Sequence, residues 1–219
     1  MAITAVITTP MNTAQATRLN RLLTAALLLL ATVAVYVATV AAIHTVGLQQ
    51  SVSRDDNPWL SAAALLSFQH PDVQASLGGY QRRQAMLWTD DAAQQQQLLT
   101  QSLQHWQAAV DARPLWPYHH LGALDVEILL NKPAADIQQR IDQMIIHTPN
   151  ERGLDKSLLE LAAFSWPKLT TAQQGWMLAR LNKLRSPELR YVLAAAQRAQ
   201  RKAIFCAYLP LKKSRRFCR

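Results

Sequence analysis

The sequence predicts an all-α protein, with one N-terminal transmembrane helix followed by an α-solenoid-like stack of helical hairpins. Three observations lead to this fold class. The chain has one long uncharged apolar segment near its N-terminus, apolar residues recur at helical spacing through the rest of it, and prolines divide it at regular intervals. Runs of alternating β-branched residues are absent, and the 219 residues include only six glycines for tight turns, so a β-sheet is not expected.

The apolar segment runs from Leu22 to Ile43 without a charged residue. At about 1.5 Å per residue, a helix of this length crosses a hydrocarbon core of roughly 30 Å. Val40-Ala41-Ala42 offers a small-residue cleavage pattern, but the apolar region of a cleaved signal peptide is only about 7–15 residues long. We therefore expect an uncleaved signal anchor over residues 18–48.

Charges on either side of the span predict its orientation. Arg18 and Arg21 precede it without a neighbouring acid, and the first charges after it are Arg54, Asp55 and Asp56. Because positively charged flanks stay in the cytoplasm, we expect the N-terminus there and the rest of the chain outside. The predicted location is the bacterial inner membrane, with the C-terminal domain in the periplasm.

Composition divides the rest of the chain into four parts. Residues 1–17 are uncharged and lack apolar periodicity, so we expect a disordered cytoplasmic N-terminus. Residues 49–57 form a short polar linker. Residues 58–205 are expected to form one helical domain, followed by a basic, cysteine-flanked tail over residues 206–219.

Charge is distributed unevenly along the chain, whose formal net charge is +9. Residues 198–219 hold eight basic groups and no acid, whereas residues 51–197 have a net charge of −1. A domain body with so little net charge argues against nucleic-acid binding.

Apolar stripes predict helices within the domain. Each stripe combines residues three or four positions apart, which share one face of a helix. The stripes are Leu99, Leu103, Trp106 and Val110; then Ile137, Ile141, Met144 and Ile145; then Leu154, Leu158, Leu161 and Ala162. Each must pack against another helix.

Prolines mark the boundaries between these helices, because proline is tolerated in a first helical turn and breaks a helix interior. Intervals of 16 to 20 residues separate Pro117, Pro133, Pro149, Pro167 and Pro187. Ser186 before Pro187 and Glu188 predicts a helix start capped by the serine hydroxyl. Thr170 and Gln173 have the spacing of a capping box.

Helices of this length with short loops pack as stacked hairpins, as in tetratricopeptide (TPR) proteins. Leu121-Gly122 is a candidate for the Leu-Gly pair of that repeat, and Pro149-Asn150 for its terminal turn. The two lie 28 residues apart, which is more than the template has. We therefore expect a degenerate, TPR-like domain.

Candidate catalytic or metal-binding residues are few. His119 and His120 are adjacent, so they point about 100° apart on a helix, and neither has a ligand-type residue four positions away, which argues against a metal site. Asp125 and Glu127 also face different sides, and solvated helix faces explain them better than acid–base catalysis. His44, at the outer end of the span, is either an interfacial histidine or a proton-relay group.

Linear motifs of catalysis are absent: there is no glycine-rich phosphate loop, nucleophile elbow or Cys-x-x-Cys pair. We accordingly predict no catalytic residues, no metal and no cofactor. Six tryptophans suggest either core residues between helices or carbohydrate-stacking platforms, and their helical positions favour the core. They are Trp59, Trp88, Trp106, Trp116, Trp166 and Trp176.

The tail holds both cysteines of the chain, Cys206 and Cys218. Outside the cytoplasm an isolated pair of this kind forms a disulfide, and a ring of this size stabilises the fold by about 3 kcal/mol. The bridge would place four basic groups on a constrained loop suited to anionic headgroups or an acidic polymer. These groups are Lys212, Lys213, Arg215 and Arg216. The alternative is a solvated basic tail.

Two stretches carry a family resemblance. MIIHTPNERGLDKSLLELAAFSWPKLTTAQQGWMLARL contains a Pro149-Asn150-Glu151 turn and the step Ser165-Trp166-Pro167-Lys168-Leu169, and AIFCAYLPLKKSRRFC contains the paired cysteines. Together they resemble the VpsP-type accessory proteins encoded in bacterial exopolysaccharide clusters, over roughly residues 110–219. The resemblance implies a single-pass helical protein with a part in polysaccharide synthesis or export, and it implies no catalytic residues.

The expected function is that of a non-catalytic, membrane-anchored accessory protein that binds polysaccharide-assembly membrane proteins through its periplasmic domain. One alternative is a general envelope scaffold, such as an assembly factor for a respiratory or secretion complex. Another is a hydrolase or transferase that lacks a linear motif.

Overall fold

The computed structural model describes residues 13–51, 57–87, 90–147 and 150–218. This part of the chain is helical throughout and contains no strand, which confirms the all-α prediction for it. The helices are α1 Thr13–Gln50, α2 Pro58–Leu66, α3 Pro71–Leu87, α4 Ala92–Ala112, α5 Pro117–Leu129, α6 Ala134–His147, α7 Asp155–Ser165, α8 Thr171–Leu181, α9 Ser186–Arg198, α10 Lys202–Ala207 and α11 Leu211–Phe217, with a short 3₁₀ helix at Trp166–Lys168. The positions of Trp88, Pro149 and Arg219 lie outside the described residues.

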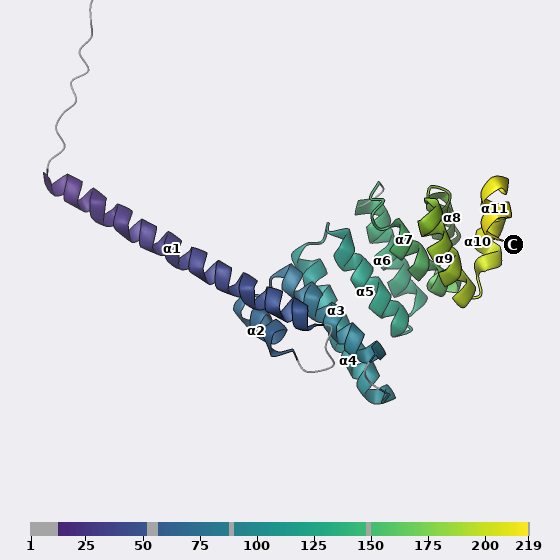
Figure 1. The fold of residues 1–219 in the computed structure, drawn as a ribbon, viewed down its shortest axis with the longest axis horizontal. Coiled ribbons are helices and arrows are strands. Elements are labelled where there is room, and N and C mark those ends of the chain that lie inside the picture. The colour runs from purple at the N-terminus through teal and green to yellow at the C-terminus, as the bar shows by residue number, and fades with distance from the viewer. Residues whose placement is uncertain (1–12, 52–56, 88–89, 148–149, 219) are drawn as a thin grey trace, which may run out of the picture.

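Helix α1 projects from the domain as a long rod (Figure 1). From Thr17 to Gln50 it is long and apolar enough to cross a membrane, with a mean hydropathy of 2.5 and no buried residue in its most apolar window. The helix begins at Thr13, so residues 13–17, which were expected to be disordered, are helical. Residues 1–12 and 52–56, which include parts of the expected N-terminal segment and linker, are outside the described residues.

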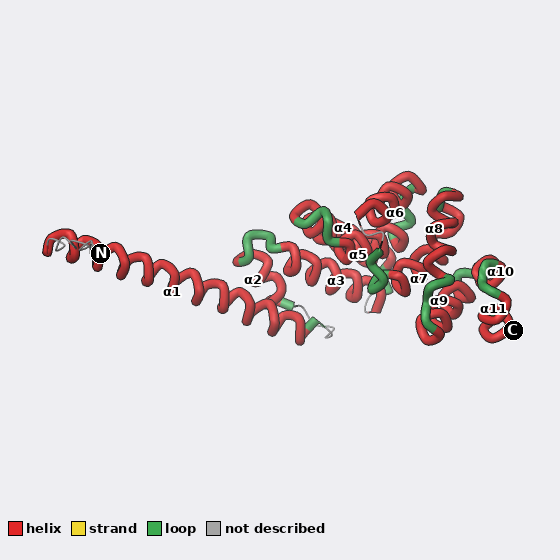
Figure 2. Tube along the Cα trace, turned by 90° about the horizontal axis from the view of Figure 1, so that it is seen from above, coloured by secondary structure: helices red, strands yellow, loops and turns green. Residues whose placement is uncertain are grey.

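The domain has two rows of helices. Contacts run in succession from α3 to α5, from α5 to α7 and from α7 to α9. Helices α4, α6 and α8 lie along the other side (Figure 2). The two rows meet where α4 contacts α3 and α5, where α6 contacts α5, and where α8 contacts α7.

A single apolar cluster runs from α5 to the C-terminal helices. Its fully buried members include Leu124, Ile137, Ile141, Met144, Leu158, Leu159, Met177, Leu181, Leu189 and Phe205. The predicted stripes of α6 and α7 supply Ile137, Ile141, Met144, Leu154, Leu158 and Ala162, so these interior faces were predicted correctly.

The cap predicted for α8 is confirmed, and the cap predicted for α9 is not. Thr170 and Gln173 form the predicted capping box at the start of α8. At α9 the cap is Arg185, whose backbone N–H donates to the Glu188 carboxylate at 3.0 Å, and Ser186 is the first helical residue. The predicted serine cap was wrong by one position, since Ser186 is itself the first helical residue and Arg185 occupies the cap.

Candidate functional site

A groove of about 1000 Å³ runs along α3, α5, α7 and α9. Its walls combine apolar, aromatic and charged residues of these four helices with Trp106 of α4. They are Arg82, Met86, Trp106, Tyr118, Leu121, Gly122, Asp125, Ile128, Leu129, Ser157, Glu160, Leu161, Phe164 and Tyr191. A surface assembled from four helices can bind an extended or helical segment of another protein.

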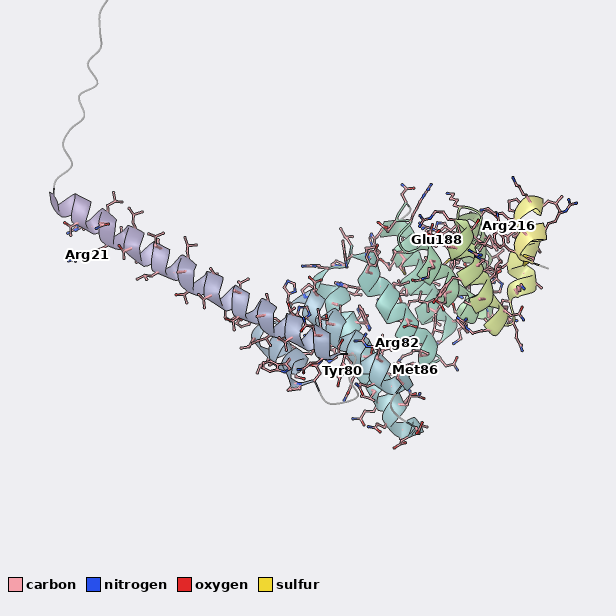
Figure 3. All side chains as sticks on the ribbon, in the orientation of Figure 1. Arg21, Tyr80, Arg82, Met86, Glu188 and Arg216 are labelled. Carbon is pink, nitrogen blue, oxygen red and sulfur yellow. A yellow bond between two sulfur atoms is a disulfide. The ribbon has the colours of Figure 1, made fainter. Side chains whose placement is uncertain are left out.

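Large side chains at the lip of the groove remain exposed. Met86, Tyr118, Phe164 and Tyr191 have between 41 and 45 % of their surface open to solvent. Figure 3 shows Met86 and Arg82 together on α3. Side chains of this type supply much of the binding energy of protein interfaces, because they bury a large area at a small cost in conformational entropy.

The charged groups of the groove are already paired. Arg82 Nε donates to Asp125 Oδ2 at 2.6 Å. Glu160 accepts the Tyr191 hydroxyl at 2.7 Å and Arg198 Nη2 at 3.1 Å. The hydrogen bond to Glu160 raises the pKa of Tyr191, so the phenol stays protonated at neutral pH. An occupant therefore meets a nearly neutral, largely apolar surface.

The floor of the groove depends on two glycines and a tryptophan. The Trp106 indole lies against Gly78 on α3 and Gly122 on α5. A Cβ atom at Gly122 would lie 2.5 Å from Trp106 Cε2, and one at Gly78 would lie 2.8 Å from Trp106 Cδ1. These glycines let α3 and α5 approach a tryptophan of α4 from two sides.

His119 and His120, on α5, contact backbone carbonyl groups at the end of α4 and in the turn that follows it. His119 Nδ1 lies 3.1 Å from the Ala109 carbonyl oxygen, and His120 Nε2 lies 2.7 Å from the Pro114 carbonyl oxygen, so the two rings satisfy backbone groups where α4 ends. Burial lowers the pKa of both imidazoles. No group of three potential metal ligands occurs within the described ranges.

Asp125 and Glu127 face different sides of α5, as predicted. Asp125 pairs with Arg82 of α3, whereas Glu127 is buried and accepts Arg140 Nη2 of α6 at 2.6 Å. The prediction of solvated faces was wrong for Glu127, because Arg140 neutralises its charge inside the fold. Their separation by α5 leaves no shared acid–base site.

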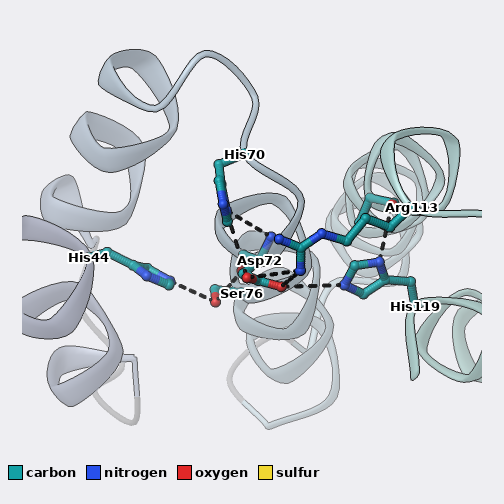
Figure 4. Close-up of polar contacts among 7 residues, drawn as sticks. His44, His70, Asp72, Ser76, Arg113 and His119 are labelled. Atoms are coloured by element: carbon teal, nitrogen blue, oxygen red, sulfur yellow. Dashed lines mark hydrogen bonds and ion pairs between the residues drawn. The ribbon is translucent and has the colours of Figure 1, made fainter. Parts of the chain in front are cut away.

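A polar cluster joins α1 to the domain (Figure 4). His44 Nε2 lies 2.9 Å from Ser76 Oγ on α3, one helical turn beyond Asp72. Asp72 accepts Arg113 Nη1 at 3.0 Å and lies 3.8 Å from His119 Nε2. His44 thus fastens the end of the long helix to α3.

The tail is folded on the domain. Cys206 and Cys218 form a disulfide across a separation of 12 residues, and the residues expected to form a loop make helix α11 instead. Lys213 Nζ donates to the Asn182 and Leu184 carbonyl oxygens at 2.8 and 3.0 Å, so it holds the tail to the α8–α9 turn. Other candidate cations of the tail, Lys212, Arg215 and Arg216, are exposed.

Tryptophans occupy both interior and surface positions. Trp166 is buried against Phe205, at a ring-centroid distance of 5.2 Å, and Arg180 stacks on Trp176 at 4.0 Å. Trp59 and Trp116, however, are more than two-fifths exposed, so they are not among the tryptophans of the core. The exposed pair lies on α2 and immediately before α5, outside the groove walls.

Comparison with family models, with curated proteins and with solved structures gives no match. The site therefore has to be interpreted from its own geometry. Sequence reasoning predicted that the helix stack would receive a partner segment but did not identify Phe164, Tyr118 or Met86 as its lip. The sequence could have indicated them, because they are large side chains that lie outside the apolar stripes, on helix faces that are otherwise polar.

Proposed function

We propose that this protein is a non-catalytic, membrane-anchored accessory protein of bacterial exopolysaccharide synthesis or export. It acts by binding a segment of a polysaccharide-assembly membrane protein in the groove along α3, α5, α7 and α9. The helical domain is, in this proposal, a degenerate TPR-like stack with the groove along the row formed by α3, α5, α7 and α9.

The groove is the observation that carries the proposal. Its volume of about 1000 Å³ and its exposed aromatic lip suit a polypeptide segment. The acids on its walls are engaged by arginines, and the two neighbouring histidines hold backbone carbonyls. The polar groups of this face thus stabilise the fold, which supports binding over catalysis.

The proposed topology places the N-terminus in the cytoplasm and the domain in the periplasm of a bacterial inner-membrane protein. Arg18 and Arg21 support it, because they lie on the N-terminal side of the span. The disulfide between Cys206 and Cys218 also supports it, because such bonds persist in oxidising compartments.

The polysaccharide context rests on the resemblance of residues 110–219 to VpsP-type proteins. A general envelope scaffold for a respiratory or secretion complex is the alternative that the same groove supports. The identity of the segment in the groove separates the two.

A photo-crosslinking amino acid at Phe164 tests the proposal in intact cells. Phe164 is 45 % exposed and lies on the groove wall, so the probe fits without repacking the core. We expect a cross-link to a membrane protein of polysaccharide assembly, and we expect Phe164→Asp to lower both the cross-linking from a second probe at Met86 and the amount of secreted polymer.

Ile146→Asp is the matched control, because Ile146 is a 66 % exposed apolar residue of α6 outside the groove. It should leave polymer secretion and cross-linking unchanged. Cross-links to respiratory or secretion subunits would support the alternative. Equal effects of the two aspartates would contradict a role for the groove.

A further inference from the structure

Helix α2 folds back along α1. At its start, Asn57 Nδ2 donates to the Gly47 carbonyl oxygen at 2.6 Å. At its end, the Tyr36 hydroxyl donates to the Leu66 carbonyl oxygen, and the Tyr36 ring lies 6.3 Å from that of Phe68. Helix α2 therefore runs antiparallel to α1, from the level of Gly47 back to the level of Tyr36.

Tyr36 lies inside the apolar segment that ends at Ile43, seven residues before its end. At about 1.5 Å per residue, this places the end of α2 roughly 10 Å below the boundary of the apolar segment. Amphipathic helices that lie in a membrane surface are buried to about 5–10 Å. The tip that follows α2 is therefore at the depth of an interfacial segment, wherever α1 crosses a bilayer.

The chemistry of α2 and its tip fits that depth. Residues 57–69 contain no charged side chain. Leu65 and Phe68 are 83 and 86 % exposed, and nothing in the described part of the domain covers them. Exposed large apolar side chains have a higher free energy in water than in lipid, so their place beside a membrane helix favours burial in the bilayer.

Several backbone carbonyl groups near the tip accept hydrogen bonds from within the protein. The Ala63 carbonyl oxygen accepts the Ser67 N–H at 2.8 Å, and the Ser67 carbonyl oxygen accepts the His70 N–H at 3.1 Å. The Leu66 carbonyl oxygen accepts the Tyr36 hydroxyl. Because an unpaired carbonyl is costly in lipid, these hydrogen bonds lower the free-energy cost of placing the end of α2 in the bilayer.

We propose that α2 and its tip, residues 58–69, dip into the outer leaflet beside α1 and insert Leu65 and Phe68 among the lipid chains. This inference rests on α1 crossing the membrane, as proposed above. The tip gives the anchor a second point of attachment, so the domain is held at a fixed rotation and tilt relative to the bilayer.

Depth measurements on the full chain in phosphatidylcholine–phosphatidylglycerol vesicles test the proposal. An environment-sensitive fluorophore is attached to a single cysteine in Phe68→Cys or Leu65→Cys, and no reductant is added, so that Cys206 and Cys218 remain bonded. The unsubstituted chain reports background labelling. Leu30→Cys on α1 and Ala135→Cys on α6, both exposed, are the lipid and water references.

We expect the probes at residues 65 and 68 to emit at short wavelength and to be quenched by lipids with a nitroxide on the acyl chain, like the probe at residue 30. Aqueous iodide should quench the probes at residues 65 and 68 less than it quenches the probe at residue 135. An aqueous tip with a lipid-embedded residue 30 would overturn this inference and leave the anchor standing. An aqueous residue 30 would overturn the anchor and the inference together.

Discussion

Among the six glycines, Gly122 has the least room for a side chain. Replacing it by alanine would place a Cβ atom 2.5 Å from the Trp106 indole, so α5 has to move away from α4. Overpacking of this kind costs about 1–3 kcal/mol, and we expect Gly122→Ala to lower the free energy of unfolding by that amount. Urea unfolding of the detergent-solubilised chain, followed by tryptophan fluorescence, measures it.

Gly175 provides the control for that change. It lies within α8, and a Cβ atom there meets nothing within 4 Å. Gly175→Ala should stabilise the chain by about 0.5–1 kcal/mol, because alanine favours the helix and loses less backbone entropy on folding. Equal destabilisation by both alanines would contradict the packing argument for Trp106.

The buried histidines predict how stability depends on pH. Burial lowers the pKa of His119 and His120, and this effect outweighs the opposing charge of Asp72 near His119. The unfolded chain, with histidine pKa values of about 6.5, then binds more protons than the folded chain below that pH. Stability should be constant above pH 7 and fall as the pH drops through 6.5, by up to about 1.4 kcal/mol per pH unit for each histidine.

Urea midpoints between pH 5 and 8 test this dependence. In the double variant His119→Gln, His120→Gln the decline should become shallower, because two groups that bind protons only on unfolding are gone. An unchanged slope would assign the acid sensitivity to other groups.

A buried ion pair joins α7 to α8. Arg180 donates to Asp155 and to the Glu151 carbonyl oxygen, and Arg180 and Asp155 are both buried. Arg180→Met leaves the Asp155 carboxylate buried without its partner, and such a loss costs about 3–5 kcal/mol. Thermal unfolding should show a clear decrease in Tm, whereas Arg185→Met, at an exposed pair with Glu188, should leave Tm nearly unchanged.

The disulfide fixes α10 and α11 to the domain. The ring closed by Cys206 and Cys218 stabilises the fold by about 3 kcal/mol, and Phe217 and Cys218 pack against the apolar core. Under reducing conditions we expect amide hydrogens of α11 to exchange faster while those of α6 and α7 keep their protection. Loss of protection throughout the domain would show instead that the tail is part of the global folding unit.

These elements also show what a sequence can predict. The stripes of α6 and α7 and the cap at Thr170 were found because burial and capping act between residues close in the chain. Helix α11 was missed because seven residues are too few to show a helical period. The groove and the α1–α2 hairpin were missed because both depend on which helices meet, and apolar stripes do not specify that.

At the scale of the whole molecule, the two basic regions lie at opposite ends. Figure 3 shows Arg21 near the free end of α1 and Arg216 on α11 at the far side of the domain. A membrane that holds α1 is therefore remote from the tail. Of the two anionic partners proposed for the tail, this arrangement favours an acidic polymer over the headgroups of that membrane.

The full chain, held in nanodiscs of neutral lipid, should bind the acidic polysaccharide polygalacturonate, and binding should weaken steeply as salt shortens the screening length below about 10 Å. Glutamine at Lys212, Arg215 and Arg216 should abolish most of it, because these cations are exposed. Lys213 stays unchanged, since it holds the tail to the α8–α9 turn.

The same replacement at the exposed cations Arg152, Lys183 and Arg190 removes equal charge elsewhere on the domain and should leave most of the affinity. Equal losses from the two triple variants would mean that net charge alone attracts the polymer and that the tail is a solvated basic end.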